Sequence, residues 1–432
     1  MRTALLLALL CQASQPAWAN AANPPAIVFE NATVIDGTGR EPAPSRTVVV
    51  EGDRIVALYE TGSRERPAGA RVIDLAGHTI MPGLIDAHVH LWPAEDRENR
   101  LRALLHSGVT TVRELAGDAR ITAPLQQRQA HGDITSPAIR FAAVFYGPRF
   151  LEDTRSRSSA EGLEAGTAAW SRVVTPELDI ARAMVEARAT GATGVKLYAS
   201  LTAEQLAELS REARRHDLLV WTHSVLFPTG SVEALAAGVD SLIHAKGLVT
   251  VAGLDGIPDN FAAGTRQWML SRPFARVDPE GPAFRAFYAE MVRQGTILEP
   301  ALMADGDLSA RPLPPPRAAM RDWACRATGA AFRAGVAIGA GTDTALRPGI
   351  LQRELVRLVE CGLPALQAVR AATQVNARAL GIEATHGTVE AGMVADLTIV
   401  AGNPAERIAD VANVRYVVQS GRLFEVPAPA RD

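Results

Sequence analysis

Two histidines stand two residues apart in the segment Asp86-Ala87-His88-Val89-His90. We predict that this segment ends a β-strand, in which residues i and i+2 point to the same face of the sheet. Both imidazoles can then reach one metal ion. On its own, such a pair is only a weak indication of a metal site.

Four further residues that can bind a metal or react stand near the ends of other predicted strands. They are Lys196 in Gly-Val-Lys-Leu-Tyr, His223 in Val-Trp-Thr-His, His244 in Ser-Leu-Ile-His and Asp343 in Gly-Ala-Gly-Thr-Asp. If the strands are parallel neighbours, these side chains and the histidine pair converge at one end of the sheet. The other histidines fall on predicted helices and loops, and we interpret them as exposed or capping residues.

The strands that must position these residues follow from the hydrophobic pattern. Short β-prone runs at 26–29, 33–35, 47–50, 55–58 and 71–75 are separated by turn signals such as Asp36-Gly37. From about Met81 onward, strands alternate with longer helical stretches. We predict strands at 79–88, 108–113, 138–144, 193–198, 218–223, 239–244, 296–301 and 336–343. This alternation is typical of an α/β fold, and here of a (β/α)8 TIM barrel.

Strand character returns near the C-terminus, at 387–392, 395–400, 414–418 and 422–426. We therefore expect the terminal segments 26–80 and 386–426 to form one small β-sandwich domain, into which the barrel of residues 81–385 is inserted. Three long loops, at 145–175, 246–283 and 302–318, each follow a predicted strand. They should lie at the carboxyl ends of the strands, where barrel enzymes hold their active sites, and should select the substrate.

The helix after the fourth barrel strand has a readable start. Thr202 and Gln205 form a capping-box pattern, and Leu206, Leu209 and Ala213 then fall on one face.

Taken together, these motifs resemble the metal-dependent amidohydrolase superfamily, and within it the imidazolonepropionase-like, prolidase-like branch. The matching motifs are PGLIDAHVH at 82–90, VKLY at 195–198, GVDSLIH at 238–244, GTD at 341–343 and EAGMVADLTIV at 390–400. The similarity covers nearly all of the chain after residue 19. The chain departs from the pattern at Thr222-His223-Ser224, where relatives often have His-Ala around the ligand. The ligand assignment is unaffected, but the substrate contacts beside it should differ.

The resemblance implies a centre of two divalent metal ions in the barrel. By position, His88, His90 and Asp343 would bind the more buried ion, and His223 and His244 the more exposed one. Zinc is the expected metal, and manganese or cobalt would also suit these ligands.

The lysines give a separate indication, because Lys196 and Lys246 are the only two lysines among 44 basic residues. The resemblance implies that Lys196 bridges both ions as a carbamate formed with carbon dioxide. An ammonium beside two cations would be repelled, whereas a carbamate is an anionic ligand that arginine cannot form. Lys246, Tyr198 and Arg113 lie near strand ends and are candidate substrate contacts. A solvated loop position is equally compatible with Lys246.

The implied activity is hydrolysis of an amide C–N bond in a small molecule, such as a dipeptide or an N-acyl amino acid. A metal-bridging hydroxide would attack the carbonyl, with Asp343 as the catalytic base. Alternatives are opening of a cyclic amide or imidazolone ring, a mononuclear deaminase, and a non-catalytic scaffold on the same fold. A serine hydrolase is not indicated, since the G-x-S-x-G motif is absent from the sequence.

The first 19 residues are typical of a secretory signal peptide: Arg2, an apolar run at 4–10, and Ala17-Trp18-Ala19. We therefore expect an exported protein, periplasmic or secreted. Cleavage would remove Cys11 and leave Cys325 and Cys361, for which two buried thiols are favoured over one disulfide.

Composition excludes some classes of protein. A hydrophobic content of 47% excludes wholesale disorder, and a net charge of −3 gives no electrostatic reason to expect nucleic acid or an anionic membrane as partner. After the signal peptide, we find no apolar stretch long enough to span a bilayer. The sequence does not indicate an oligomeric state.

Overall fold

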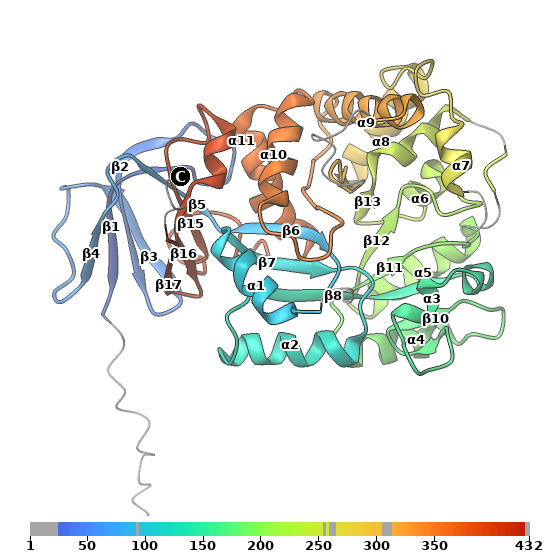
Figure 1. Cartoon of the computed structure of the whole chain (residues 1–432), viewed down its shortest axis with the longest axis horizontal. Helices are drawn as coiled ribbons and strands as arrows, with labels where there is room; N and C mark the ends of the chain where they lie inside the picture. The colour runs from blue at the N-terminus through green and yellow to red at the C-terminus, as the bar shows by residue number, and fades with distance from the viewer. Residues whose placement is uncertain (1–24, 92–94, 254–255, 259–264, 305–312, 428–432) are drawn as a thin grey trace, which may run out of the picture.

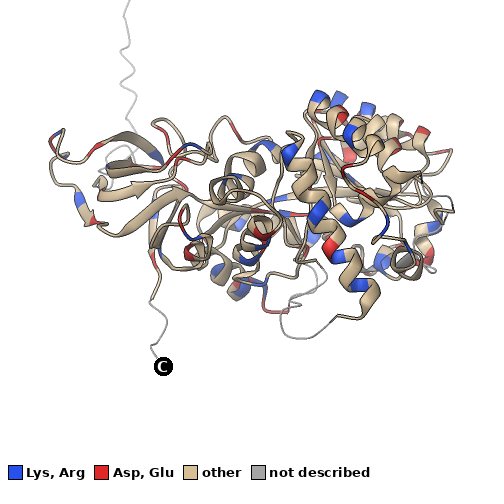
Figure 2. Ribbon diagram, turned by 90° about the horizontal axis from the view of Figure 1, so that it is seen from above, with Lys and Arg blue, Asp and Glu red and all other residues tan. Residues whose placement is uncertain are grey.

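The computed structural model describes residues 25–427, apart from 92–94, 254–255, 259–264 and 305–312. The predicted signal peptide lies outside the described residues. Figure 1 shows an elongated molecule with one sheet at its end and a second, curled sheet surrounded by helices. Basic and acidic residues are interspersed along the ribbon (Figure 2). In the described part of the chain, no helix is both long and apolar enough to cross a membrane.

The first sheet joins the two ends of the chain (Figure 1). Its N-terminal strands are β1 (Ile27–Val34), β2 (Ala43–Glu51), β3 (Arg54–Glu60), β4 (Arg71–Asp74) and β5 (His78–Pro82). Its C-terminal strands are β15 (Leu397–Ala401), β16 (Val414–Gln419) and β17 (Arg422–Glu425). The strand order is β17-β16-β15-β5-β1-β2-β3, with β4 also paired to β1. The segment 387–392, expected to be a strand, is a loop in which Gly387 and Gly392 have positive φ.

The second sheet is parallel along its main path. Its strands in spatial order are β6 (Leu84–Val89), β7 (Val109–Glu114), β8 (Ala138–Tyr146), β11 (Gly194–Leu197), β12 (Leu219–His223), β13 (Ser241–Ile243) and β14 (Ile297–Glu299). Two short strands, β9 (Thr167–Ala168) and β10 (Ser171–Val173), extend it beside β8. Seven of the predicted barrel strands therefore form, in chain order.

The remaining predicted strand, 336–343, is not a regular strand. Its part of the chain makes isolated parallel bridges to both edges of the sheet, from Ile338 to Leu298 and from Thr344 to Val89. The predicted strand 79–88 is divided at Gly83 between β5 and β6, and so belongs to both sheets. A side chain at Gly83 would collide with Thr110, which explains the glycine at this crossing.

Helices cover the outside of the parallel sheet (Figure 1). They are α1 (Arg97–His106), α2 (Ala119–His131), α3 (Arg155–Ser158), α4 (Ile180–Ala189), α5 (Ala203–Arg215), α6 (Ser231–Ala236), α7 (Thr265–Leu270), α8 (Pro282–Gln294), α9 (Pro315–Arg333), α10 (Ile350–Glu360), α11 (Ala365–Arg370) and α12 (Asn376–Ala379). The predicted start of α5 is confirmed: Thr202 and Gln205 make both hydrogen bonds of a capping box. The predicted inner face of α5 is buried.

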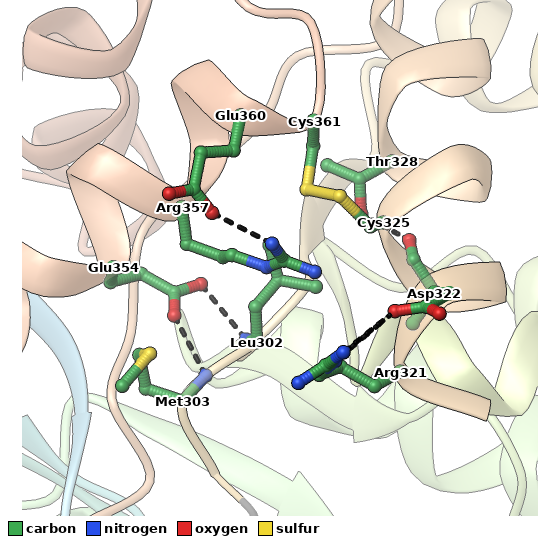
Figure 3. Close-up of a disulfide and its surroundings, with 11 residues drawn as sticks. Leu302, Met303, Arg321, Asp322, Cys325, Thr328, Glu354, Arg357, Glu360 and Cys361 are labelled. Atoms are coloured by element: carbon green, nitrogen blue, oxygen red, sulfur yellow. Dashed lines mark hydrogen bonds and ion pairs between the residues drawn. A yellow bond between two sulfur atoms is a disulfide. The ribbon is translucent and has the colours of Figure 1, made fainter. Parts of the chain in front are cut away.

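The cysteine prediction is wrong: Cys325 and Cys361 form a disulfide, with a Cα–Cα distance of 5.0 Å (Figure 3). Cys325 lies in α9 and Cys361 directly follows α10, so the packing of these helices brings together residues 36 positions apart. Beside the disulfide, the buried carboxyl group of Glu354 in α10 accepts hydrogen bonds from the backbone N–H groups of Leu302 and Met303, at 2.9 Å each. Both contacts fix the chain after β14 and the adjoining α9.

Candidate metal centre

A cavity of about 580 Å3 lies at the carboxyl ends of the parallel strands. Lys196 and Tyr198 stand at the end of β11, His223 is the last residue of β12, and His244 directly follows β13. All four line this cavity. Parallel pairing forces these strands to end at the same edge of the sheet, which explains why residues far apart in sequence meet here.

Asp343 stands at the centre of the cluster. Its Oδ1 lies 3.2 Å from His88 Nε2 and 2.8 Å from His90 Nε2, and its Oδ2 lies 3.6 Å from His244 Nε2. Lys196 Nζ lies 3.4 Å from His88 Nε2. One carboxylate therefore faces three imidazoles, and the lysine amine lies next to one of them.

His223 joins the cluster through its ring. The ring centroids of His223 and His244 are 4.7 Å apart, and those of His223 and Tyr198 are 4.6 Å apart. The structure thus brings all six predicted metal-centre residues to one place.

A residue that the sequence reasoning missed, Glu114, fixes His90. Glu114 ends β7, is fully buried, and places Oε1 3.3 Å from His90 Nδ1. Its carboxylate also accepts the backbone N–H groups of Leu91 and Ala116. Histidines that bind metals commonly donate the second ring nitrogen to such a carboxylate. Its position directly after the predicted strand 108–113 was the available signal.

The buried environment sets the charges of the cluster. Burial lowers the pKa values of His88 and His223 well below the usual range, so both rings are neutral near pH 7 and offer lone pairs. Burial also lowers the pKa of Lys196 to about 8. Burial would raise the pKa of Asp343, but the neighbouring histidines outweigh it and hold that pKa well below the usual range.

His90 has the opposite shift. Burial alone would lower its pKa, but the hydrogen bonds to Asp343 and Glu114 outweigh burial and raise the pKa of His90 to about 9. His90 Nε2 and Asp343 Oδ1 already face each other, so a metal cation that replaced the proton between them could be bound by both.

Two of the clustered residues have an unusual backbone conformation. His244 and Asp343 have φ values of 73° and 51°, in the left-handed region that non-glycine residues rarely adopt. Such strain is typical of functional sites whose surroundings enforce it. The backbone N–H of Asp343 donates to the carbonyl of His88 at 2.8 Å, which couples the strand of the histidine pair to the aspartate.

Asp86 adds further hydrogen bonds between the segment of the histidine pair and the segment of Asp343. The sequence reasoning did not identify Asp86 as a functional residue. One carboxylate oxygen accepts the N–H groups of His88 and Thr342, and the other accepts the Thr342 hydroxyl at 2.9 Å. The ligand-bearing ends of two chain segments are thereby tied together.

The donor set fits a divalent metal ion. His88, His244 and Asp343 offer ligand atoms within 4.8 Å of one another, and their nitrogen and carboxylate-oxygen donors suit zinc and similar ions.

The three segments predicted as long loops all contribute to the lining of the cavity. Phe150 and Arg155 come from the first loop, Lys246 and Met269 from the second, and Arg317 from the third. Their predicted place at the carboxyl ends of the strands is confirmed. Phe150 and Met269 make part of the wall apolar.

The charged residues that line the cavity are mostly basic. Arg155, Lys246 and Arg317 face a cavity in which Asp343 is the only carboxylate among the described lining residues. Arg155 is held by Asp153 through hydrogen bonds of 2.9 and 2.5 Å, and its Nη1 donates to the Tyr198 hydroxyl at 3.2 Å. The cavity is therefore suited to a ligand with an anionic group and apolar parts.

One predicted substrate contact is not at the cavity. Arg113 is fully buried inside the curled sheet, where Nη2 lies 2.5 Å from Glu299 Oε2 and the guanidinium stacks 4.4 Å from the Trp221 ring centroid. The last strand residue, Glu114, faces the site instead. Alternate residues of a strand point to different sides, and the sequence did not show which residue of β7 would reach the opening.

Comparisons with known proteins agree with this geometry. The sequence profile described as the Amidohydrolase family matches residues 79–424. The chain is 24% identical to ochratoxinase from Aspergillus niger over 394 residues, covering 81% of this chain and 76% of that protein. It is 30% identical to imidazolonepropionase from Streptomyces coelicolor over 141 residues, which is 36% of that protein's length.

Solved structures show the same fold. A Xaa-Pro dipeptidase with bound methionine aligns with a TM-score of 0.73 at 23% identity, covering 93% of this chain and all of that one. The structure of A. niger ochratoxinase aligns with a TM-score of 0.73 at 20% identity, covering 94% and 96% of the two chains.

Proposed function

Because the chain belongs to the amidohydrolase family, we propose that it hydrolyses an amide C–N bond in a small molecule, of the dipeptide or N-acyl amino acid type. The observation that best supports this proposal is that His88, His244 and Asp343 lie close together at the carboxyl ends of the parallel strands. We propose that segment 336–343 closes this sheet into a (β/α)8 barrel, since its neighbourhood bridges both edges.

We further propose that the centre holds two divalent ions, most simply zinc, with Lys196 carbamylated between them. The lowered pKa of Lys196 favours this reaction, because the unprotonated amine is the form that adds to carbon dioxide. Bound ions would supply an activated water and a Lewis acid for the carbonyl oxygen.

The residues of the chain have distinct tasks in this reaction. Asp343 takes the proton of the attacking water and passes it to the leaving nitrogen. Burial raises the pKa of Tyr198 to about 12, so its hydroxyl stays protonated and can donate to the oxygen on which negative charge develops. Because Arg155 donates to the Tyr198 oxygen, the tyrosine proton is directed away from Arg155. Lys246 and Arg317 are placed to bind a carboxylate of the substrate.

The test is a hydrolysis screen of dipeptides, N-acyl amino acids and lactams, with metal analysis of the same preparation. We expect N-acyl amino acids or dipeptides to be cleaved and their carboxamide analogues to show a raised KM. Cleavage of lactams alone would favour ring opening. Protein without stoichiometric metal, with function unchanged by chelation, would refute the proposal.

A second test addresses the base. Asp343→Asn is expected to lower kcat by about 100-fold or more while most of the metal is retained. A variant with near-normal rates would show that Asp343 is not the base.

We also propose that the protein works in an oxidising compartment outside the cytosol. The Cys325–Cys361 disulfide supports this location, because such bonds are rare where thiols are kept reduced.

A further inference from the structure

A cluster of buried hydroxyl groups contacts the backbone of the turn that begins at His244. Ser224, Ser231 and Thr250, which we call the hydroxyl cluster, come from the end of β12, the start of α6 and the 3-10 helix η3 (Ala245–Ala252). All three side chains are buried, and Ser224 also lines the cavity. Ser224 is also where the sequence departs from the family pattern around His223.

Each hydroxyl of the cluster has a defined partner. Ser224 Oγ donates to the backbone carbonyl of His244 at 2.5 Å, and Ser231 Oγ donates to the carbonyl of Ser224 at 2.6 Å. Thr250 Oγ1 donates to the carbonyl of Gly247 at 2.9 Å and accepts the N–H of Ser231 at 3.0 Å. The cluster thus joins the residue after His223 to both ends of the His244–Gly247 turn.

The backbone of His244 needs such support. Its φ of 73° is unfavourable for a residue with a Cβ, so neighbouring contacts must hold it in place. Its N–H donates to the Glu299 carbonyl at 2.8 Å, and its carbonyl accepts both the Ser224 hydroxyl and the N–H of Gly247. Ser224 is the only side chain among these three partners.

We propose that Ser224 is a positioning residue for the metal ion that His223 and His244 would hold. It sets the direction of the His244 imidazole by fixing the backbone of that residue, and it holds the turn that carries Lys246. This inference rests on the proposed two-metal function. Substitutions of the outer-shell groups that orient metal ligands typically weaken metal binding by about 10- to 100-fold.

Gly247 offers an independent way to displace the hydroxyl. A Cβ at Gly247 would overlap Ser224 Oγ, whereas its distance from Ser224 Cβ would be 3.2 Å. Gly247→Ala should therefore push the hydroxyl away from the His244 carbonyl. Removing the hydroxyl first should relieve most of that overlap, so the effects of the two substitutions should not add.

The experiment titrates the metal-free full-length protein with Zn2+ against a chromophoric chelator, for the wild type, Ser224→Ala, Gly247→Ala and the double variant. Ser210→Ala, which removes a buried serine hydroxyl in α5, is the matched control. We expect Ser224→Ala to bind one of two ions about 10-fold more weakly and the other within about threefold of wild type. The double variant should resemble Ser224→Ala, and Ser210→Ala the wild type.

The outcomes separate this inference from the proposed function. Two tightly bound ions in both the wild type and Ser224→Ala would overturn the role of Ser224 and leave the two-metal function standing. Additive losses in the double variant would also overturn it. A wild-type protein that binds no zinc would overturn the proposed function and this inference together.

Discussion

Replacing Arg113 by methionine should destabilise the fold without changing substrate binding. Arg113 and Glu299 are both fully buried, and the closest N–O distance between them is 2.5 Å. The guanidinium also stacks 4.4 Å from the Trp221 ring centroid. Arg113→Met would leave the Glu299 carboxylate buried without its cation.

The size of the effect follows from this burial. Breaking a buried ion pair by removing one partner costs about 3–5 kcal/mol. For a chain of this length, that loss lowers the thermal midpoint by on the order of 5 °C. The double variant Arg113→Met/Glu299→Leu should recover part of the loss, because it removes the stranded charge.

The assay is thermal unfolding followed by circular dichroism, together with KM for the best substrate of the screen. The expected result is a lower midpoint with an unchanged KM. A wild-type midpoint combined with a raised KM would refute the assignment and return Arg113 to the substrate site. A double variant no more stable than Arg113→Met would refute the argument from a stranded charge.

Three further predictions concern stability. The double variant Cys325→Ser/Cys361→Ser should lose about 3–4 kcal/mol, the chain-entropy value for a separation of 36 residues, and an unchanged denaturation midpoint would argue against the bridge. Burial raises the pKa of Glu354 from 4.5 to about 8, so the folded state holds a proton that the unfolded state releases. Stability should therefore fall as pH rises from about 5 to 8, by up to about 1.4 kcal/mol per unit, and Glu354→Gln should flatten this dependence in melts across that range. Thr202→Ala should cost about 1 kcal/mol through loss of the α5 cap, measured by urea unfolding, and no loss would show that the capping box contributes little.

The features predicted best from the sequence are the strands, which follow from hydrophobic periodicity, and the site residues that stand at the strand ends. Parallel strands end at a common edge, so residues such as His223 and His244 could be placed together once their strands were recognised. The start of α5 was readable because Thr202 and Gln205 act through local hydrogen bonds.

What the sequence could not predict depends on packing between distant segments. The disulfide forms because α9 and α10 pack together, and no local pattern encodes that contact. Arg113 and Glu114 are neighbours on β7, yet one lies in the sheet interior and the other supports His90. Within segment 336–343, Ile338 makes an isolated bridge to Leu298. Gly339 and Gly341 bring the backbone of this segment close to Asn376 and His88.

The pairing of β5 with β15 has a consequence for how the chain is made. Pro82 pairs with Leu397, so β5 must wait for a partner strand that is synthesised much later than β5 itself. Until then, β5 presents an unpaired edge, which is prone to wrong association. A chain that stops before β15 leaves that edge open, even if the parallel sheet has already formed. The pairing of β5 with β15 therefore makes correct folding depend on synthesis of β15, and chains that lack β15 remain accessible to proteases and chaperones.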